Sequence, residues 1–369
     1  MSGRRWSLWL GPPVALVAVA LVVSRFQPGA EAGGRVTPPP AGACAASPVT
    51  TDAAGVVKRD AGPASWWRLS ERLDDHGVLK GRQLAVGRGG AIALTLDLAA
   101  ESMASGPIGG LVVLAVDDGR KSEIRLVSAG AGCSWLVDTS PNVVRGAILD
   151  PSDGSVLAHL VNRATRADLG TWRFGARGAL TEPALVAGAV PNGLLDGPVW
   201  ATDLRLDQAG TSLAVQSCTD TGCVTRLFDL PVRGGDPRVL RGAQGPILGF
   251  AAGRLITWAA CSGFPCAIQS WDLATGLATK ILDRADAAAV TADGRYLVAS
   301  IDARVGHTLR IELATNTRAL VKGIGRDELL LAGGATATTG LQVGPDEIAV
   351  AAPGANPRSF RPAAAEVIP

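Results

Sequence analysis

The stretch SCTDTGCVTRLFDL, residues 217–230, has a counterpart 43 residues further along the chain, ACSGFPCAIQSWDL at residues 260–273. Both stretches contain two cysteines separated by four residues, and both end in an aromatic residue followed by Asp-Leu. A further shift of 41 residues sets Gly294 on Gly253. Self-similarity at a period of about 40–45 residues indicates a supersecondary unit that buries its faces by stacking on copies of itself.

Within each unit, short apolar runs alternate with Asp/Gly turns. Few windows hold a helical period, whereas alternating runs such as YLVAS (296–300) and TLRIEL (308–313) are typical of strands. We read four strands per unit, with the hydrophobic core between neighbouring sheets. The predicted fold is all-β: a single β-propeller over residues 65–369 with about six four-stranded blades, five to seven being compatible with the repeat. The units are predicted to begin near residues 82, 145, 201, 246, 287 and 327.

Two stretches carry a resemblance to a known family. SWDLATG (270–276) matches the end of a third strand and the turn into a fourth, and TADGRYLVAS (291–300) matches the turn into a second strand. From residue 82 to residue 350 the chain resembles the WD-repeat-like β-propellers, particularly the periplasmic Tol-type (TolB-like) branch. The resemblance implies that loops joining second and third strands share one face with the inter-blade connections, and that this face binds partners.

The N-terminus has the features of a targeting segment. Arg4 and Arg5 precede an uncharged apolar stretch that runs to Val23 and is close to the length that spans a bilayer. Two interpretations are open: a retained signal anchor, or a signal peptide cleaved near residues 30–32. Lipidation of Cys44 is a third, although that residue lies far from the apolar run. All three predict an extracytoplasmic domain, either held at the cell membrane by a single span or secreted.

Residues 24–64 connect the predicted apolar helix (1–23) to the propeller. They are rich in Pro, Gly and Ala and have no apolar periodicity, which predicts a flexible linker. Residues 65–80 are a candidate for the strand that closes the ring. The chain has a net charge of +2 and no basic cluster after its N-terminus, so its composition offers no footprint for nucleic acid.

The six cysteines are even in number and belong to an exported chain, which predicts disulfide bonds. Two pairs would close hairpins with the four-residue loops TDTG and SGFP. A four-thiolate zinc site is the rival interpretation, but equivalent loops of adjacent blades lie too far apart for four zinc–sulfur bonds. A free Cys44 that forms an intermolecular bridge is the alternative for the third pair. The predicted pairs are Cys218–Cys223, Cys261–Cys266 and Cys44–Cys133.

Catalytic motifs are missing from the sequence. There is no Gly-x-Ser-x-Gly elbow and no phosphate-binding glycine loop. His76 follows Asp74 and Asp75 in the densest acid/base cluster, which we read as a solvated turn, and we read His159 as a buried structural residue. The sequence therefore predicts no catalytic residue, no cofactor and no metal.

The predicted partner-binding surface consists of the loops that join second and third strands; the other interpretation is that these are merely solvated loop tips. A Phe in a disulfide-closed loop suits binding because the staple lowers the cost of ordering the loop. The candidate residues are Arg163, Arg166, Asp168, Asp220, Phe264, Arg304 and His307.

The predicted function is a membrane-anchored, extracytoplasmic and non-catalytic binding or scaffold module for a protein or other component of the bacterial cell envelope. The alternative is a propeller hydrolase or lyase that acts on a polysaccharide or small metabolite in the central channel. An enzyme predicts that several acidic or His side chains with perturbed pKa values converge at one mouth of the channel.

Overall fold

A computed structural model describes the greater part of the chain beyond the N-terminus. The predicted apolar helix and most of the predicted linker lie outside the described residues. No helix in the part of the chain that the structure describes is long and apolar enough to cross a membrane. The described residues are 43–50, 52, 65–88, 91–108, 110–175, 182–207, 209–230, 237–260, 265–285, 287–290, 294–302, 307–321, 341–344, 347–350, 358–360 and 366–367.

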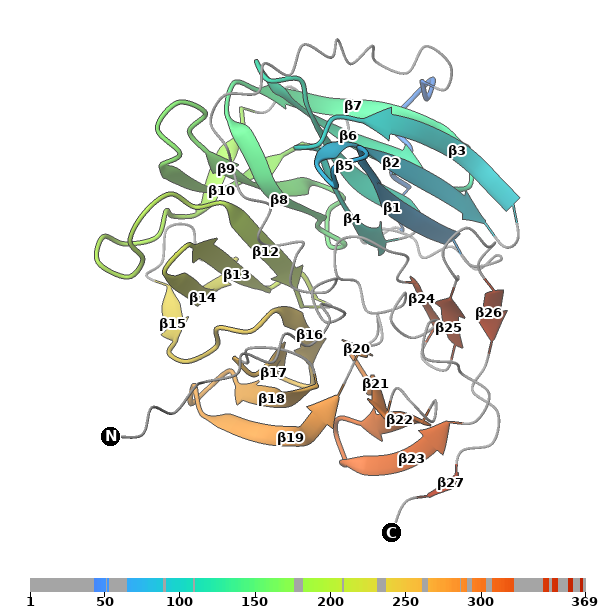
Figure 1. Ribbon diagram of the computed structural model, residues 1–369, viewed down its shortest axis with the longest axis vertical. Coiled ribbons are helices and arrows are strands. Elements are labelled where there is room, and N and C mark those ends of the chain that lie inside the picture. Colours follow the sequence, from blue (N-terminus) through green and yellow to red (C-terminus); the bar gives the residue numbers. More distant parts are fainter. Residues whose placement is uncertain are drawn as a thin grey trace, which may run out of the picture.

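The described residues form seven antiparallel sheets that follow one another around a centre (Figure 1). The all-β prediction is confirmed, and seven sheets is the upper end of the predicted range rather than the estimate of six. The first sheet has three strands and the next three have four each. Their strands are β1 (Ser65–Leu73), β2 (Leu79–Arg88), β3 (Ala91–Leu98); β4 (Met103–Ile108), β5 (Leu111–Asp117), β6 (Ser122–Ser128), β7 (Cys133–Ser140); β8 (Val143–Leu149), β9 (Val156–Val161), β10 (Asp168–Phe174), β11 (Ala184–Ala187); β12 (Ala201–Leu206), β13 (Ser212–Thr219), β14 (Gly222–Asp229) and β15 (Arg238–Leu240).

The remaining three sheets have four, five and three strands. In the sixth sheet the short C-terminal strand β27 pairs with β23 as a fifth strand. The strands are β16 (Ile247–Ala251), β17 (Arg254–Trp258), β18 (Cys266–Asp272), β19 (Ala278–Ala285); β20 (Ala287–Val290), β21 (Tyr296–Asp302), β22 (His307–Glu312), β23 (Thr317–Val321), β27 (Glu366–Val367); β24 (Leu341–Gly344), β25 (Glu347–Val350) and β26 (Arg358–Phe360).

The first strands of successive sheets are neighbours around the centre. Strand β8 contacts β4 and β12, and β16 contacts β12 and β20, while β1 contacts both β4 and β24. Figure 1 shows β12, β16 and β20 towards the middle and β15, β19 and β23 at the rim. Radial sheets with their first strands at the centre are the architecture of a β-propeller.

The core lies between neighbouring sheets, as predicted. Five clusters of buried apolar side chains each join one sheet to the next, from the first-to-second interface to the fifth-to-sixth. Val112 and Leu114, for example, are fully buried against side chains of the first sheet, whereas Val113 and Ala115 on the other face of β5 pack towards the third sheet. The period-2 alternation of each strand therefore serves two interfaces.

Four predicted unit starts are confirmed within a few residues, because β8, β12, β16 and β20 begin at residues 143, 201, 247 and 287. The start near residue 82 is wrong, since that residue lies inside β2, and a whole unit, β4–β7, was not predicted. The start near residue 327 lies outside the described residues. The candidate closing segment is also corrected: residues 65–73 pair with β2 as the innermost strand of their own sheet.

The first sheet lacks the strand that begins the others. β3 ends at Leu98 and β4 begins at Met103, with four residues between them. Four residues span at most about 14 Å, which is too short to cross the length of an eight-residue strand, about 26 Å. β3 therefore ends at the edge where β4 starts, as a fourth strand does, and β1–β3 correspond in direction to second, third and fourth strands.

Candidate binding face

One face of the ring carries both kinds of connection that were predicted to bind a partner. We call it the loop face. It is formed by the connections between second and third strands, among them 118–121, 162–167 and 220–221, and by the connections between sheets, among them 99–102 and 141–142. An antiparallel four-stranded sheet places these connections at the same end, because strands alternate in direction.

The 162–167 connection is a tight turn built by Asn162. Its side-chain oxygen accepts hydrogen bonds from the amides of Ala164 and Thr165, at 3.0 and 2.9 Å. The Arg166 amide donates to the carbonyl of Asn162 at 2.8 Å, and Arg166 adopts a left-handed conformation with a φ of 60°. The turn holds two arginines, Arg163 and Arg166, at fixed positions on the loop face.

Arg163 links two neighbouring sheets and is not a free-standing residue at a loop tip. Its two terminal nitrogens donate to the two carboxylate oxygens of Asp117 in the second sheet, at 3.0 and 2.8 Å, and its Nε donates to the carbonyl of Pro141 at 3.2 Å. The Asp117 side chain is only 6% exposed and that of Arg163 is 25% exposed. A two-pronged Arg–carboxylate pair of this kind is strong and fixes the orientation of both groups.

Asp117 is held in its charged form. Burial raises the pKa of its carboxyl, but hydrogen bonds from Arg163, from the Ser122 hydroxyl at 2.7 Å and from the Gly119 amide at 2.8 Å outweigh this effect. The pKa of Asp117 therefore lies below its ordinary value, and the carboxylate stays ionised at neutral pH.

A half-open hollow of about 200 Å³ lies beside this ion pair, between the second and third sheets. Glu101 enters it from the connection between the first two sheets; this side chain is 40% exposed, and one of its oxygens lies 2.7 Å from Nη1 of Arg145. The hollow thus combines carboxylates and guanidiniums at or next to the loop face. Its lining residues are Glu101, Asp117, Gly119, Val143, Arg163 and Arg166.

Asp168, another predicted binding residue, is turned inwards. Its side chain is 8% exposed and lies 3.0 Å from Nε2 of the fully buried His159, whose Nδ1 is 3.0 Å from the Thr171 hydroxyl. A bulge in β10 makes this possible, because Gly170 adopts a φ of 80° and an added Cβ would lie 2.3 Å from the carbonyl of Ala187. His159 is therefore a buried structural histidine, as predicted.

Arg226 of the fourth sheet completes this buried cluster. Its side chain is fully buried, one terminal nitrogen lies 3.7 Å from Asp168, and the other donates to the carbonyl of Gly188 at 2.7 Å. Burial raises the pKa of Asp168, but its contacts with His159 and with the amides of Gly170 and Val190 lower the pKa by more. The pKa of Asp168 therefore lies below its ordinary value. The cluster joins the third and fourth sheets and is inaccessible to a partner.

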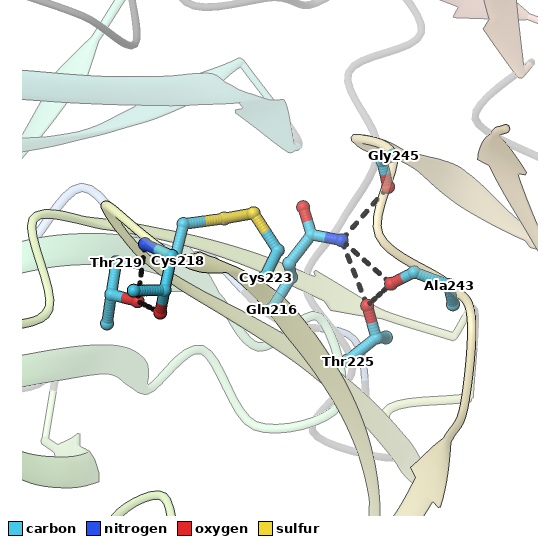
Figure 2. The surroundings of a disulfide bond; sticks show 8 residues. Gln216, Cys218, Thr219, Cys223, Thr225, Ala243 and Gly245 are labelled. Carbon is cyan, nitrogen blue, oxygen red and sulfur yellow. Dashed lines mark hydrogen bonds between the residues drawn. A yellow bond between two sulfur atoms is a disulfide. The ribbon is translucent and has the colours of Figure 1, made fainter. Parts of the chain in front are cut away.

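The Cys218–Cys223 disulfide closes the next hairpin on the loop face (Figure 2). The two residues pair directly with a Cα–Cα distance of 4.1 Å. The Cys218 carbonyl accepts from the Trp200 amide on its other side, so this is the closer, non-hydrogen-bonded type of cross-strand pair. Because residues 219 and 222 also pair, the turn has two residues, not the four predicted, and Asp220 is exposed at its tip.

The base of this hairpin is fixed by Gln216. Its side-chain amide donates to the Thr225 hydroxyl at 2.9 Å and to the carbonyls of Ala243 and Gly245 at 3.3 and 2.9 Å, as Figure 2 shows. The two carbonyls belong to the connection between the fourth and fifth sheets. The disulfide and this buried amide together hold the hairpin against its neighbour.

The other cysteine predictions fare as follows. The Cys44–Cys133 disulfide is present and joins the predicted linker to β7, so the intermolecular alternative for Cys44 is wrong. Strand β7 belongs to the second sheet. Cys266 is disulfide-bonded, while its predicted partner Cys261 lies outside the described residues. The four-thiolate zinc alternative is excluded by the Cys218–Cys223 bond.

The remaining predicted binding residues are not brought to the hollow by any described contact. Phe264 and Arg304 lie outside the described residues, and His307 begins β22. No described group of three or more His, Cys, Asp or Glu side chains could hold a metal ion. Sequence reasoning missed Glu101 and Asp117, although the Asp-Asp-Gly turn at 117–119 has the same turn chemistry as the units that were recognised.

Comparisons with known proteins concern the fold alone. No family model matches the chain, and no curated protein matches it. Among solved structures, TolB from Acinetobacter baumannii is 12% identical with a TM-score of 0.45, over 73% of this chain and 66% of that one. A putative 6-phosphogluconolactonase from Bacteroides fragilis is 14% identical, with a TM-score of 0.42 over 77% and 85%. A puromycin hydrolase mutant is 16% identical, with a TM-score of 0.39 over 69% and 44%. The chain thus spans two thirds or less of TolB and under half of the hydrolase.

Proposed function

We propose that the protein is an extracytoplasmic, non-catalytic β-propeller that binds a protein partner on its loop face, as a scaffold module of the bacterial cell envelope. The observation that carries the proposal is the half-open hollow on that face, where fixed charges from two sheets meet. Side chains that stay charged at neutral pH suit recognition of a partner, because they neither gain nor lose a proton when the partner binds.

The pKa shifts on this face favour binding over catalysis. A general acid or base works best when its pKa lies near the working pH and it can reach the substrate. The pKa of Asp117 lies below its ordinary value, and His159 is fully buried. Neither group suits proton transfer to a bound substrate.

One residue favours the alternative of a propeller hydrolase or lyase. Burial raises the pKa of Asp203, which lies on the inner strand β12 and is 28% exposed. Its carboxylate lies 2.6 Å from Nη1 of Arg205 and accepts a hydrogen bond from the Ile247 amide of the next inner strand. These contacts join β12 to β16, which supports a structural role, and a single acid does not make the convergent cluster that an enzyme needs.

The disulfides support the proposed compartment. Two described cysteine pairs are bonded, and such bonds persist in oxidising surroundings such as the bacterial periplasm. The apolar segment 1–23 would then act as an export signal that is either retained as an anchor or removed. Cell fractionation, with mass spectrometry of the N-terminal peptide, distinguishes these two fates.

Site-specific photocrosslinking in the encoding organism tests the binding face. A photoreactive residue replaces Arg120, which is exposed on the loop face, and in a matched control it replaces Leu277, which is 69% exposed on the third-to-fourth connection of the fifth sheet. We expect a discrete protein adduct from position 120 and none from position 277. Adducts only from position 277, or turnover of an ester, lactone, peptide or glycoside substrate that Asp203→Asn abolishes, would contradict the proposal.

A further inference from the structure

Arg166 occupies a position that other turns of this molecule give to residues without the same steric penalty. In the connections 150–155, 162–167, 272–277 and 312–317, the fifth residue donates its amide to the carbonyl of the first. That fifth residue has a φ between 58° and 74° in all four. The residues at this position are Gly154, Arg166, Gly276 and Asn316.

The comparison shows that the turn itself does not require an arginine at this position. A left-handed backbone costs a residue with a full side chain about 1 kcal/mol, whereas glycine adopts it freely and asparagine tolerates it. Glycine would therefore make the same turn at lower cost. Strained residues that a structure retains are concentrated at binding and catalytic sites, and Arg166 lines the hollow on the loop face.

The hollow suits a small, singly charged group. Its volume of about 200 Å³ is smaller than a usual small-molecule site, which encloses about 300–1,000 Å³. A guanidinium has five N–H donors, so it can hold a carboxylate through two of them and keep another contact. Across the hollow, the half-exposed Glu101 uses one oxygen for Arg145, and it can accept from a peptide N–H through the other.

We infer that the hollow binds one carboxylate of an extended peptide segment of a protein partner, with Arg166 as the residue that recognises it. The inference rests on the proposed function and names the chemistry that the loop face selects. Arg166 pairs with an Asp or Glu side chain, or with a chain terminus, and Glu101 accepts a hydrogen bond from the same segment.

The two carboxylates in the lining decide against more highly charged anions. Asp117 remains ionised and Glu101 lies beside it in the same hollow. A phosphate group carries close to two negative charges at neutral pH, and Arg163 and Arg145, which are paired with these two acids, leave less charge to balance the second negative charge than to balance a carboxylate. Arg163 cannot offset this, because Asp117 already holds its guanidinium through two hydrogen bonds.

Selection from a display library of random linear peptides on the full-length protein tests the inference. We expect selected peptides to share an Asp or Glu at one position, and replacement of that residue by Asn or Gln to weaken binding at least tenfold, as loss of a charged hydrogen-bonded partner does. Arg166→Gly should weaken binding equally while preserving the fold. Asn316→Gly, in the same kind of turn on the opposite face, is the matched control and should leave binding unchanged. A phosphoserine at the acidic position should bind more weakly than glutamate.

The outcomes separate this inference from the proposed function. No selected peptide, no shared acid, tighter binding of phosphoserine, or binding that survives Arg166→Gly would each overturn the carboxylate site. If adducts still form at position 120 and are unaffected by Arg166→Gly, the loop face binds its partner by other residues and the inference alone fails. If position 120 gives no adduct, the proposed function fails first.

Discussion

Two neighbouring connections on the loop face solve the same geometric problem in different ways. The 162–167 connection is a six-residue turn that sends Arg163 across to the second sheet and borders a hollow. The Cys218–Cys223 hairpin is closed by a disulfide, turns in two residues and exposes Asp220 at its tip. Both join a second strand to a third, yet only the first lines the hollow.

The difference lies in where each connection obtains its rigidity. The disulfide hairpin is rigid through bonds within its own pair of strands and through Gln216 behind it. The 162–167 connection has the internal hydrogen bonds of Asn162, but it is also tied to charged groups of the adjacent sheets, because Asp117 holds Arg163 and Asp168, directly after the turn, lies beside Arg226. A cross-link inside one unit makes a stable hairpin, whereas contacts between units bring side chains from different sheets to one place.

The largest effect is expected from Asp168→Ala, which breaks the inter-sheet cluster. The substitution leaves the fully buried Arg226 and His159 without their carboxylate. Removing one partner of a buried ion pair costs about 3–5 kcal/mol. Urea unfolding at neutral pH, followed by tryptophan fluorescence, measures the loss.

Asp220→Ala is the matched control on the disulfide hairpin. Its side chain is exposed at the turn, so the free energy of unfolding should change by less than about 0.5 kcal/mol. If the two variants lose similar stability, the contrast between the two connections is wrong. Asp168→Asn, which keeps the shape and removes the charge, should lie between them.

The next effect is expected at the disulfide hairpin. Replacing Cys218 and Cys223 together by Ser opens a loop of five residues' separation, for which the chain-entropy treatment gives about 2 kcal/mol. Denaturant unfolding under non-reducing conditions measures this loss. Because the hairpin does not border the hollow, the double variant should bind peptide as tightly as the unchanged protein does. A loss of binding would show that the disulfide also affects the shape of the site.

A smaller, pH-dependent effect is expected from the Arg163–Asp117 pair. Burial raises the pKa of the Asp117 carboxyl and so offsets part of the lowering that its hydrogen bonds cause. The folded-state pKa of Asp117 lies below its ordinary value of 3.8. The pair therefore contributes stability above that value and loses it as the pH falls through the folded-state pKa. Unfolding midpoints measured between about pH 5 and about pH 2 should fall more steeply for the unchanged protein than for Arg163→Met. Parallel curves would contradict this assignment.

The strand plan was predictable from local sequence, but one unit escaped. Asp/Gly turns and period-2 runs fixed the starts of four sheets within a few residues, since those signals act over a few neighbouring positions. The β4–β7 unit was missed because its third strand, β6, reads SEIRLVS and lacks the acidic residue followed by Leu at which the third strands of the fourth, fifth and sixth sheets end. The short connection 99–102, which makes β3 a fourth strand, also gives no repeat signal.

The site was predictable only in part, for a physical reason. The face and the turn that carries Arg163 and Arg166 follow from strand order, which the repeat reveals. Their partners do not, because Asp117 lies 46 residues away on the neighbouring sheet. Such pairs are set by how the sheets pack around the ring, and Asp168 turns inwards through a bulge at Gly170 that changes the register of β10.

The smallest effect sharpens the comparison most, because it separates backbone strain from charge at one residue. Arg166→Ala removes the guanidinium and keeps a side chain in a left-handed position, whereas Arg166→Gly removes both the guanidinium and the strain. Arg166→Gly should therefore be more stable than Arg166→Ala by about 0.5–1 kcal/mol, and thermal unfolding of the pair measures the difference. The same comparison at Asn316, where asparagine already tolerates the conformation, should again favour Gly over Ala, although a gain over the natural residue should be seen at 166 and not at 316. If Arg166→Gly is instead the less stable of the two, the left-handed backbone does not penalise a side chain at position 166, and the arginine at this position is no sign of a ligand.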